Sequence, residues 1–308
     1  MLNKTCIVIS GATAAGKTKL SLQLAAYFKT NIISADSRQC YRELNIGVAK
    51  PTASDLKKIK HYFINTHSIH EEVNAGRFET YALRAVTEIF EQHDTAIMVG
   101  GTGLYLKAFC RGMDDMPEVK DQIRQWVRQQ YETLGINWLQ EMLQQHDPVF
   151  YGKGEMRNPQ RMMRALEVKL SSGKSILDLH SMPQKQRKFS IVSIGVELPR
   201  KNIYHNINKR ADDMMEEGLL KEATALYPNR HLNALQTVGY TEIFDYIDGK
   251  HTLQQAVDTI KKNTRHYAKR QLTWFKKDKT IHWFAPDDVK SIINFIEGQI
   301  NTKQQSTF

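Results

Sequence analysis

Cysteine is scarce in this sequence, and the few cysteines present form no pairing pattern. The 308-residue chain contains only Cys6, Cys40 and Cys110, an odd number with no C-x-x-C pair. This spacing excludes a disulfide framework and a cysteine-based zinc module, and it is typical of proteins from a reducing compartment.

Long apolar runs are missing as well. No uninterrupted apolar stretch approaches the roughly 18 residues that a membrane-spanning helix needs, and no signal-peptide core precedes the first strand-like run. We therefore expect a cytoplasmic protein that does not enter a membrane. The contents of 41% hydrophobic and 25% charged residues are ordinary for a folded globular protein, and this excludes wholesale disorder.

Positive charge is in excess. The chain has 43 Lys and Arg against 33 Asp and Glu, a formal net charge of +10. Such an excess favours a polyanionic partner such as a nucleic acid. A basic enzyme without such a partner is the alternative, and composition alone does not separate the two.

Strand-like and helix-like segments alternate in the first third of the chain. Residues 5–10 and 31–35 are short apolar runs of the buried-strand type, and the segment 17–28 between them has helical periodicity. A further helix is predicted over 77–93 and a strand over 95–99. This alternation predicts a parallel sheet covered by helices.

A phosphate-binding motif follows the first strand. The pattern G-x-x-x-x-G-K-[ST] is matched by Gly11, Ala12, Thr13, Ala14, Ala15, Gly16, Lys17 and Thr18. In such a loop successive backbone N–H groups point inward, a helix N-terminus adds positive potential, Lys17 supplies a point charge, and Thr18 can hold Mg²⁺. The motif predicts a diphosphate or triphosphate site. A plain glycine turn is the alternative, which the strand and helix on either side disfavour.

The middle of the chain has a different pattern. From about residue 117 to 179 the segments are helical, and a strand-like run returns only at 190–198. We expect an α/β protein in which residues 1–115 and 190–308 form a P-loop NTPase-like three-layer core with a parallel sheet. Residues 116–189 are expected to form a mostly helical insertion domain.

An acidic residue is missing where many P-loop NTPases have one. The strand at 95–99 runs into Gly100-Gly101-Thr102 without an Asp to help hold Mg²⁺. The acid follows the second strand instead, as Asp36. Because the carboxyl ends of parallel strands line the ligand crevice, we expect Gly11, Asp36 and Thr102 to converge there. Asp36 then suits a general base; the alternative is that Asp36 or Ser37 caps the next helix.

A series of motifs in this chain resembles the tRNA dimethylallyltransferases, also called tRNA isopentenyltransferases. They follow the family's order over nearly the whole chain: residues 11–18, 34–39 (SADSRQ), 46–51 (IGVAKP), 99–105 (VGGTGLY), 158–161 (NPQR), 238–240 (VGY) and 268–274 (AKRQLTW). The resemblance implies transfer of a dimethylallyl group from dimethylallyl diphosphate to N6 of the adenosine 3′ to the anticodon. Diphosphate is released, and Mg²⁺ is required.

The resemblance also assigns roles to residues. The loop 11–18, with Lys17 as a catalytic group and Thr18 as a metal ligand, holds the donor diphosphate. Asp36 accepts a proton from the adenine amine, and Thr102 helps to place the acceptor. The chemistry agrees, because an exocyclic amine is a weak nucleophile and an allylic diphosphate leaves readily once its charge is neutralised.

The implied partner is the anticodon stem-loop of a tRNA, bound by a monomer that extrudes the target base. The residues expected to contact it are Asp36, Ser37, Arg38, Gln39, Thr102, Arg124, Gln160, Arg161, Met162, Met163, Arg164, Arg265, Lys269 and Arg270. A run of Lys and Arg over residues 261–279, interleaved with aromatic residues, has the composition of an RNA-binding segment. A solvated helix face is the alternative.

One departure from the family pattern concerns Gln236, where many bacterial members carry an Arg before Val-Gly-Tyr. Its positive charge would have to come from another residue, such as Arg38 or Arg265. The chain also lacks the C-terminal zinc-finger extension of eukaryotic members, which implies the compact bacterial form.

Three other functions are open from the residues. A small-molecule P-loop kinase would need only the phosphate loop. An adenylate isopentenyltransferase would perform the same chemistry on a free nucleotide, but the helical insertion argues against it. A non-catalytic RNA-binding protein is the third alternative, and the presence of Lys17, Asp36 and Thr102 argues against it.

Overall fold

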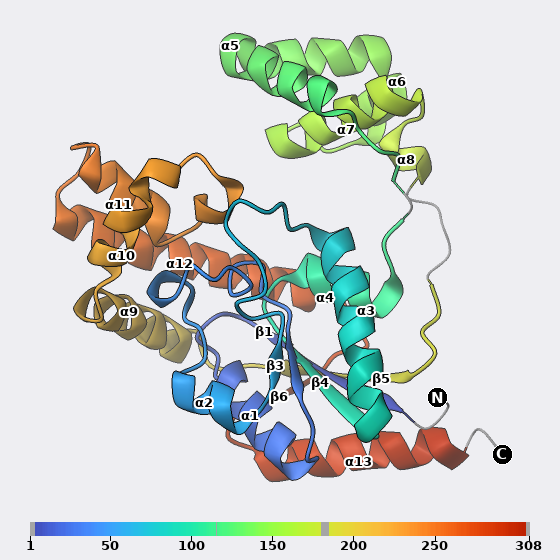
Figure 1. The fold of residues 1–308 in the computed structure, drawn as a ribbon. Coiled ribbons are helices and arrows are strands. Elements are labelled where there is room, and N and C mark those ends of the chain that lie inside the picture. Colours follow the sequence, from blue (N-terminus) through green and yellow to red (C-terminus); the bar gives the residue numbers. More distant parts are fainter. Residues whose placement is uncertain (1–3, 115, 180–184, 306–308) are drawn as a thin grey trace. The chain divides into compact units, whose positions relative to one another are not determined.

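The computed structural model describes residues 4–114, 116–179 and 185–305, and the chain divides into two units. Residues 1–111 and 186–308 form the core unit, and residues 112–185 form a helical unit. Figure 1 shows the elements of both units. Among the described residues no helix is both long and apolar enough to cross a membrane.

The core unit contains one six-stranded parallel sheet with the strand order β3-β2-β4-β1-β5-β6. Its strands are β1 (Thr5–Gly11), β2 (Ile32–Ser34), β3 (His61–Tyr62), β4 (Thr95–Val99), β5 (Ser190–Val196) and β6 (His282–Phe284). Its helices are α1 (Lys17–Tyr27), α2 (Ala53–Lys58), α3 (Ala75–Gln92), α4 (Gly103–Arg111), α9 (Arg200–Glu216), α10 (Leu219–Leu226), α11 (Tyr240–Ile247), α12 (Leu253–Phe275) and α13 (Val289–Gln305). Single 3₁₀ turns lie at η1 (Ile46–Val48), η2 (Tyr227–Asn229) and η3 (Asn233–Leu235).

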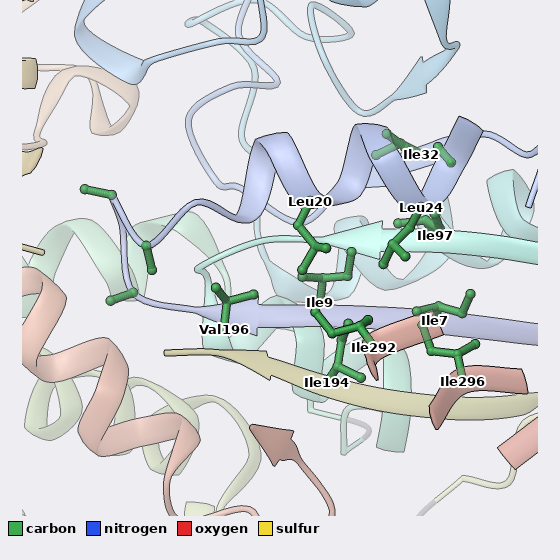
Figure 2. Packing of buried hydrophobic residues seen from close by; sticks show 14 of the residues in the cluster. Ile7, Ile9, Leu20, Leu24, Ile32, Ile97, Ile194, Val196, Ile292 and Ile296 are labelled. Carbon is green, nitrogen blue, oxygen red and sulfur yellow. The ribbon is translucent and has the colours of Figure 1, made fainter. Parts of the chain in front are cut away.

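Helices cover both faces of the sheet because its strands are apolar on both sides. All seven residues of β1 are buried. Ile7 and Ile9 face a core cluster that includes Leu20 and Leu24 of α1 and Ile292 of α13 (Figure 2). The alternate residues of β1 point to the opposite face, which α3 and α4 cover (Figure 1). The core therefore has the three layers expected from the sequence.

The strand order creates a switch point at the centre of the sheet. From β1 the chain passes to β2 and β3 on one side and returns to β4, and it later crosses to β5 on the other side of β1. In open parallel sheets the ligand crevice lies beyond the carboxyl ends of the strands at such a point. The loop after β1 is the phosphate-binding motif.

The helical unit has a core of its own. It contains α5 (Asp121–His146), α6 (Pro148–Lys153), α7 (Pro159–Ser172) and α8 (Ile176–Leu179), and α5 is kinked at Gly135. Val127 and Leu139 of α5 pack with Met162 and Leu166 of α7, and all four are fully buried. No strand occurs among the described residues of this unit.

The structure differs from the sequence prediction in its edge strands and at the boundaries between the units. The strands β3 and β6 were not predicted, because runs of two and three residues are too short to show a period. Residues 186–189 belong to the core unit rather than to the insertion. The physical reason is Arg187, which donates hydrogen bonds to the backbone carbonyls of Ala108 and Phe109, both at 2.7 Å, and pairs with Glu79. Residues 180–184 of the expected insertion lie outside the described residues.

Candidate functional site

The phosphate-binding loop joins the buried strand β1 to helix α1. Gly11 has a positive φ of 146°, and a Cβ atom there would lie 2.7 Å from the carbonyl oxygen of Val196, so glycine is required. The Lys17 ammonium donates a hydrogen bond to the carbonyl of Ala12 at 2.6 Å. Burial, and next the charge of Arg210, lower the pKa of Lys17 to about 8, while Asp36 opposes the shift.

Two helices hold the first half of this loop from outside. The Thr13 N–H donates to Oε1 of Gln271 on α12 at 2.8 Å, and Nδ2 of Asn206 on α9 donates to the carbonyl of Ala14 at 3.1 Å. Arg210, also on α9, donates to the Thr13 hydroxyl at 3.4 Å. The sequence analysis missed Arg210 because it stands in no motif and reaches the loop only through the tertiary fold. Its guanidinium places a second cation beside Lys17.

Asp36 lies in the turn that follows β2. Its Oδ1 accepts hydrogen bonds from the backbone N–H groups of Arg38 at 2.8 Å and Gln39 at 3.3 Å. In the described part of the chain no hydrogen bond to the other carboxylate oxygen is present. Asp36 therefore caps its own turn with one oxygen and still has a second oxygen that can accept a proton. The alternative weighed for it was the cap of a helix, but residues 37–40 form a turn and not a helix.

Thr102 connects the turn after β4 with the Asp36 turn. Its hydroxyl oxygen accepts a hydrogen bond from the Ser37 N–H at 3.1 Å, and its own N–H donates to the carbonyl of Ala35 at 3.3 Å. The phenol of Tyr267 on α12 lies close by. Burial, and next the charge of Asp36, raise the pKa of Tyr267 to about 12. This phenol stays protonated at neutral pH and can donate a hydrogen bond beside Asp36.

A cavity of about 540 Å³ opens between these loops. Among the residues that line it are Gly16, Lys17, Thr18, Asp36, Gln39, Gly101, Arg210, Tyr267 and Gln271. Of the three residues predicted to converge at the strand ends, Asp36 lines the cavity. Gly11 is the last residue of β1, and Thr102 contacts the Asp36 turn through the Ser37 N–H, so neither of these two is among the lining residues.

The wall of the cavity beyond Asp36 is built by a second group of motif residues. Gln39 donates from Nε2 to the carbonyl of Ala49 at 3.0 Å, which ties the segment 34–39 to the segment 46–51. Glu222 of α10 accepts hydrogen bonds from the N–H of Gly47 at 3.0 Å and from the Tyr240 hydroxyl at 2.6 Å. Glu222 therefore connects the motif at 46–51 with the motif at 238–240, although the sequence analysis did not single out this residue.

Arg38 and Arg265 were considered as sources of the positive charge that many family members have at the position of Gln236, and the two have different partners in the structure. Arg38 donates to the backbone carbonyl of Asn233 at 2.9 Å and to that of Gln236 at 3.4 Å. Arg265 instead donates to Oδ1 of Asn208 on α9 at 2.7 Å. Of these two arginines, Arg38 is the one next to Gln236.

Only part of the basic run on α12 is open to a partner. The Lys261 ammonium forms an ion pair with Oδ1 of Asp212 on α9 at 2.6 Å. The Lys276 ammonium forms an ion pair with Oε2 of Glu197 at 2.8 Å. Lys269 and Arg270 are exposed and form no ion pair in the described part of the chain, and they line a surface pocket together with Trp274. Cations next to an exposed indole form the combination that single-stranded RNA binding uses.

The residues predicted for RNA contact in the helical unit divide into two groups. Met162 is 0% and Met163 7% exposed, and both side chains pack into the core of the unit, so RNA contact by these two side chains stays a prediction that their burial disfavours. They occupy the apolar stripe of α7, whereas Gln160 and Arg161 at its start are exposed. Arg164 is half-buried and pairs with Glu167 at 3.4 Å.

Arg124 of α5 lies near the same carboxylate. Burial raises the pKa of Glu167, and the charges of Arg164 and Arg124 oppose that shift. Both arginines therefore interact with the half-buried carboxylate of Glu167 within the helical unit.

Comparison with known proteins identifies relatives that cover nearly the whole chain. The model of the IPP transferase family matches residues 39–278. A tRNA dimethylallyltransferase from Flavobacterium johnsoniae is 47% identical over 300 residues, covering 95% of this chain and 97% of that relative. A tRNA dimethylallyltransferase 1 from Bacteroides fragilis is 42% identical over 300 residues, covering 97% of this chain and all of that relative.

Solved structures agree with these relatives. The tRNA isopentenylpyrophosphate transferase of Bacillus halodurans superimposes with a TM-score of 0.74 at 34% identity and covers 99% of both chains. A eukaryotic dimethylallyltransferase acting on tRNA superimposes with a TM-score of 0.77 at 26% identity, covering 93% of this chain and 75% of that one. The predicted P-loop NTPase-like fold is confirmed by these neighbours. With a family model that matches residues 39–278 and relatives that cover nearly the whole chain, this chain belongs to the IPP transferase family.

Proposed function

We propose that this chain transfers the dimethylallyl group of dimethylallyl diphosphate to N6 of the adenosine on the 3′ side of the anticodon in tRNA, with release of diphosphate. The observation that carries the proposal is the cavity that contains both the phosphate loop and Asp36. One side of the cavity can hold a leaving diphosphate, and the other presents a carboxylate to a nucleophile. The names of the relatives support the choice of donor and acceptor.

Two cations face the donor. Lys17 and Arg210 both line the cavity, and the first-turn N–H groups of α1 lack intrahelical partners, so they can bind phosphate oxygens. These charges stabilise the negative charge that develops on the diphosphate as the bond between C1 of the prenyl group and oxygen breaks. Arg210 joins Lys17 in this role.

A magnesium ion fits this site only as a partner of the diphosphate. The described residues contain no group of three or more His, Cys, Asp or Glu side chains that could hold a metal ion by themselves. Thr18 is exposed and lines the cavity, and Mg²⁺ binds readily to one or two protein oxygens, substrate phosphates and water. Thr18 would hold the ion, which would neutralise diphosphate charge.

Asp36 acts on the acceptor. The adenine N6 attacks C1 of the prenyl group, a C–N bond forms while the C–O bond breaks, and the proton of the amine passes to the second carboxylate oxygen of Asp36. The other oxygen remains bound to the N–H groups of Arg38 and Gln39, which keeps the carboxylate in place. Thr102 supports the same turn through Ser37.

The RNA is bound outside the cavity. An adenine inside an anticodon loop has to leave its stack before it can enter such a site. The exposed cations Lys269 and Arg270 bind the phosphates nearby, and the exposed start of α7, with Gln160 and Arg161, provides a second contact from the helical unit.

One assay separates this function from its alternatives. The protein is incubated with labelled dimethylallyl diphosphate and unmodified tRNA, with the same donor and AMP, and with ATP alone. Label in tRNA and none in AMP is the expected result. Label in AMP alone would identify an adenylate isopentenyltransferase. ATP turnover without prenyl transfer would identify a kinase or an ATPase, and either outcome would refute the proposal.

A further inference from the structure

Gln271 is a buried amide near the C-terminal end of the basic helix α12. Only 6% of it is exposed, although its neighbour Arg270 faces solvent. Its Oε1 accepts the Thr13 N–H at 2.8 Å, and its Nε2 donates to the carbonyl of Gly101 at 2.8 Å. The two partners belong to the loops that follow β1 and β4, so one side chain connects the phosphate loop with the turn that leads to Thr102.

The orientation and identity of this side chain are determined by its partners. A backbone N–H can only donate and a backbone carbonyl can only accept, so the two bonds require an acceptor and a donor at opposite ends of one planar group. Glutamate would lack the donor, and leucine would lack both. A Cβ atom on Gly101 would lie 2.2 Å from Nε2, so only glycine leaves room for the amide there.

Each bond has a consequence for the cavity. The bond from Thr13 fixes the first half of the phosphate loop against α12. Within the loop, the Ala15 N–H donates to the carbonyl of Ala12 at 3.3 Å, so the N–H groups that remain for a diphosphate are those at the start of α1. The bond to Gly101 holds the turn in which Thr102 binds the carbonyl of Ala35 and the N–H of Ser37. The turn that carries Asp36 is thus connected to the phosphate loop through a short series of hydrogen bonds.

We infer that Gln271 is a positioning residue that fixes the separation between the phosphate loop and the Asp36 turn by bonding to Thr13 and Gly101 at once. The inference rests on the proposed function, in which a donor held by one loop must meet an acceptor held by the other. The reacting atoms in such a step must lie about 3–3.5 Å apart, and a misplacement of about 1 Å costs roughly 100-fold in rate.

The substitution Gln271→Leu tests this directly, because it keeps the volume of the side chain and removes both bonds. We expect kcat to fall by about 10- to 100-fold, while the KM for tRNA stays within about threefold, since Gln271 does not face the solvent-exposed surface of α12. The matched control is Gln254→Leu, an exposed position on the same helix. Rates are compared per folded enzyme, with melting curves for each variant. An unchanged kcat, or a fall that only follows the loss of folded protein, would overturn the inference.

Calorimetric binding of inorganic diphosphate gives a readout that does not depend on prenyl transfer. Weaker binding by Gln271→Leu than by the wild type supports the inference even if the wild type proves inactive toward tRNA, a result that would refute the proposed function alone. If the wild type is inactive toward tRNA, equal binding of diphosphate by the two proteins overturns the inference.

A double-mutant cycle tests the proposed contact itself. Gly101→Ala should displace the amide and lower kcat about as much as Gln271→Ala does. The double variant should then be no slower than either single variant, because the methyl group occupies space that the amide has left. Losses that multiply would contradict a shared mechanism.

Discussion

Replacement of Asp36 separates its two roles, because each carboxylate oxygen has a different task. The change Asp36→Asn keeps an oxygen that can accept the N–H groups of Arg38 and Gln39, and Asn caps backbone N–H groups about as well as Asp. Stability should therefore change by less than about 0.5 kcal/mol. The amide cannot accept the amine proton, so kcat should fall by about 10²- to 10⁴-fold, which corresponds to roughly 3–5 kcal/mol of activation free energy.

Asp36→Ala gives the comparison. It removes the cap as well as the base, and loss of such a cap costs about 1 kcal/mol, a decrease of roughly 2 °C in melting temperature for a protein of this size. The assay is single-turnover transfer of labelled dimethylallyl to tRNA, with tRNA affinity and thermal unfolding measured on the same samples. If Asp36 were only a cap, the Asn variant would keep near-normal turnover and only the Ala variant would be impaired. That result would refute the assignment of the base.

The cations of the site give three further expectations. The pKa of Lys17, lowered to about 8, makes its charge disappear as the pH rises through that value, so the Kd for diphosphate should rise by about tenfold per pH unit above it, whereas Lys17→Arg should show no such rise. Arg210→Ala should raise the KM for the donor by about 10-fold or more, because a charge-assisted contact is lost, while tRNA affinity stays unchanged. Lys269→Ala and Arg270→Ala should each weaken tRNA binding and reduce its salt dependence by about one phosphate contact, and Lys290→Ala on α13 serves as the control.

For each of these expectations, one result would contradict it. A diphosphate affinity that is flat between pH 7 and 9.5 would show that Lys17 does not bind the phosphates in its protonated form. A normal donor KM in the Arg210 variant would place its guanidinium outside the donor site. A salt slope equal to that of the wild type would show that the exposed cations of α12 do not contact RNA.

Features that depend on local pattern could be predicted from the sequence. The phosphate loop, the alternation of strands and helices, and the placement of Asp36 near a strand end all follow from short stretches whose geometry is set by neighbouring residues. Because the sheet is parallel, strand ends that are distant in sequence meet at one edge, and Gly11, Asp36 and Thr102 were expected to converge there. Of these three, Asp36 lines the cavity, together with residues of the phosphate loop.

Features that depend on tertiary contacts could not be predicted from the sequence. Arg210, Glu222 and Gln271 lie on helices, and only the packing of α9, α10 and α12 brings them against the loops that surround the cavity. The burial of Met162 and Met163 could not be predicted either, since the expected contact segment includes residues of the apolar stripe of α7. The two edge strands were too short for any period to be visible.

The most direct test of the central claim is the identity of the product. Unmodified tRNA is incubated with this protein and dimethylallyl diphosphate, the anticodon stem-loop is excised, and its fragments are analysed by mass spectrometry. The account predicts a gain equal to one dimethylallyl group on the adenosine 3′ to the anticodon, and no such gain with the Asp36→Asn protein over the same time. A dimethylallyl group at any other position, or an unmodified tRNA after prolonged incubation with the wild-type protein, would contradict it.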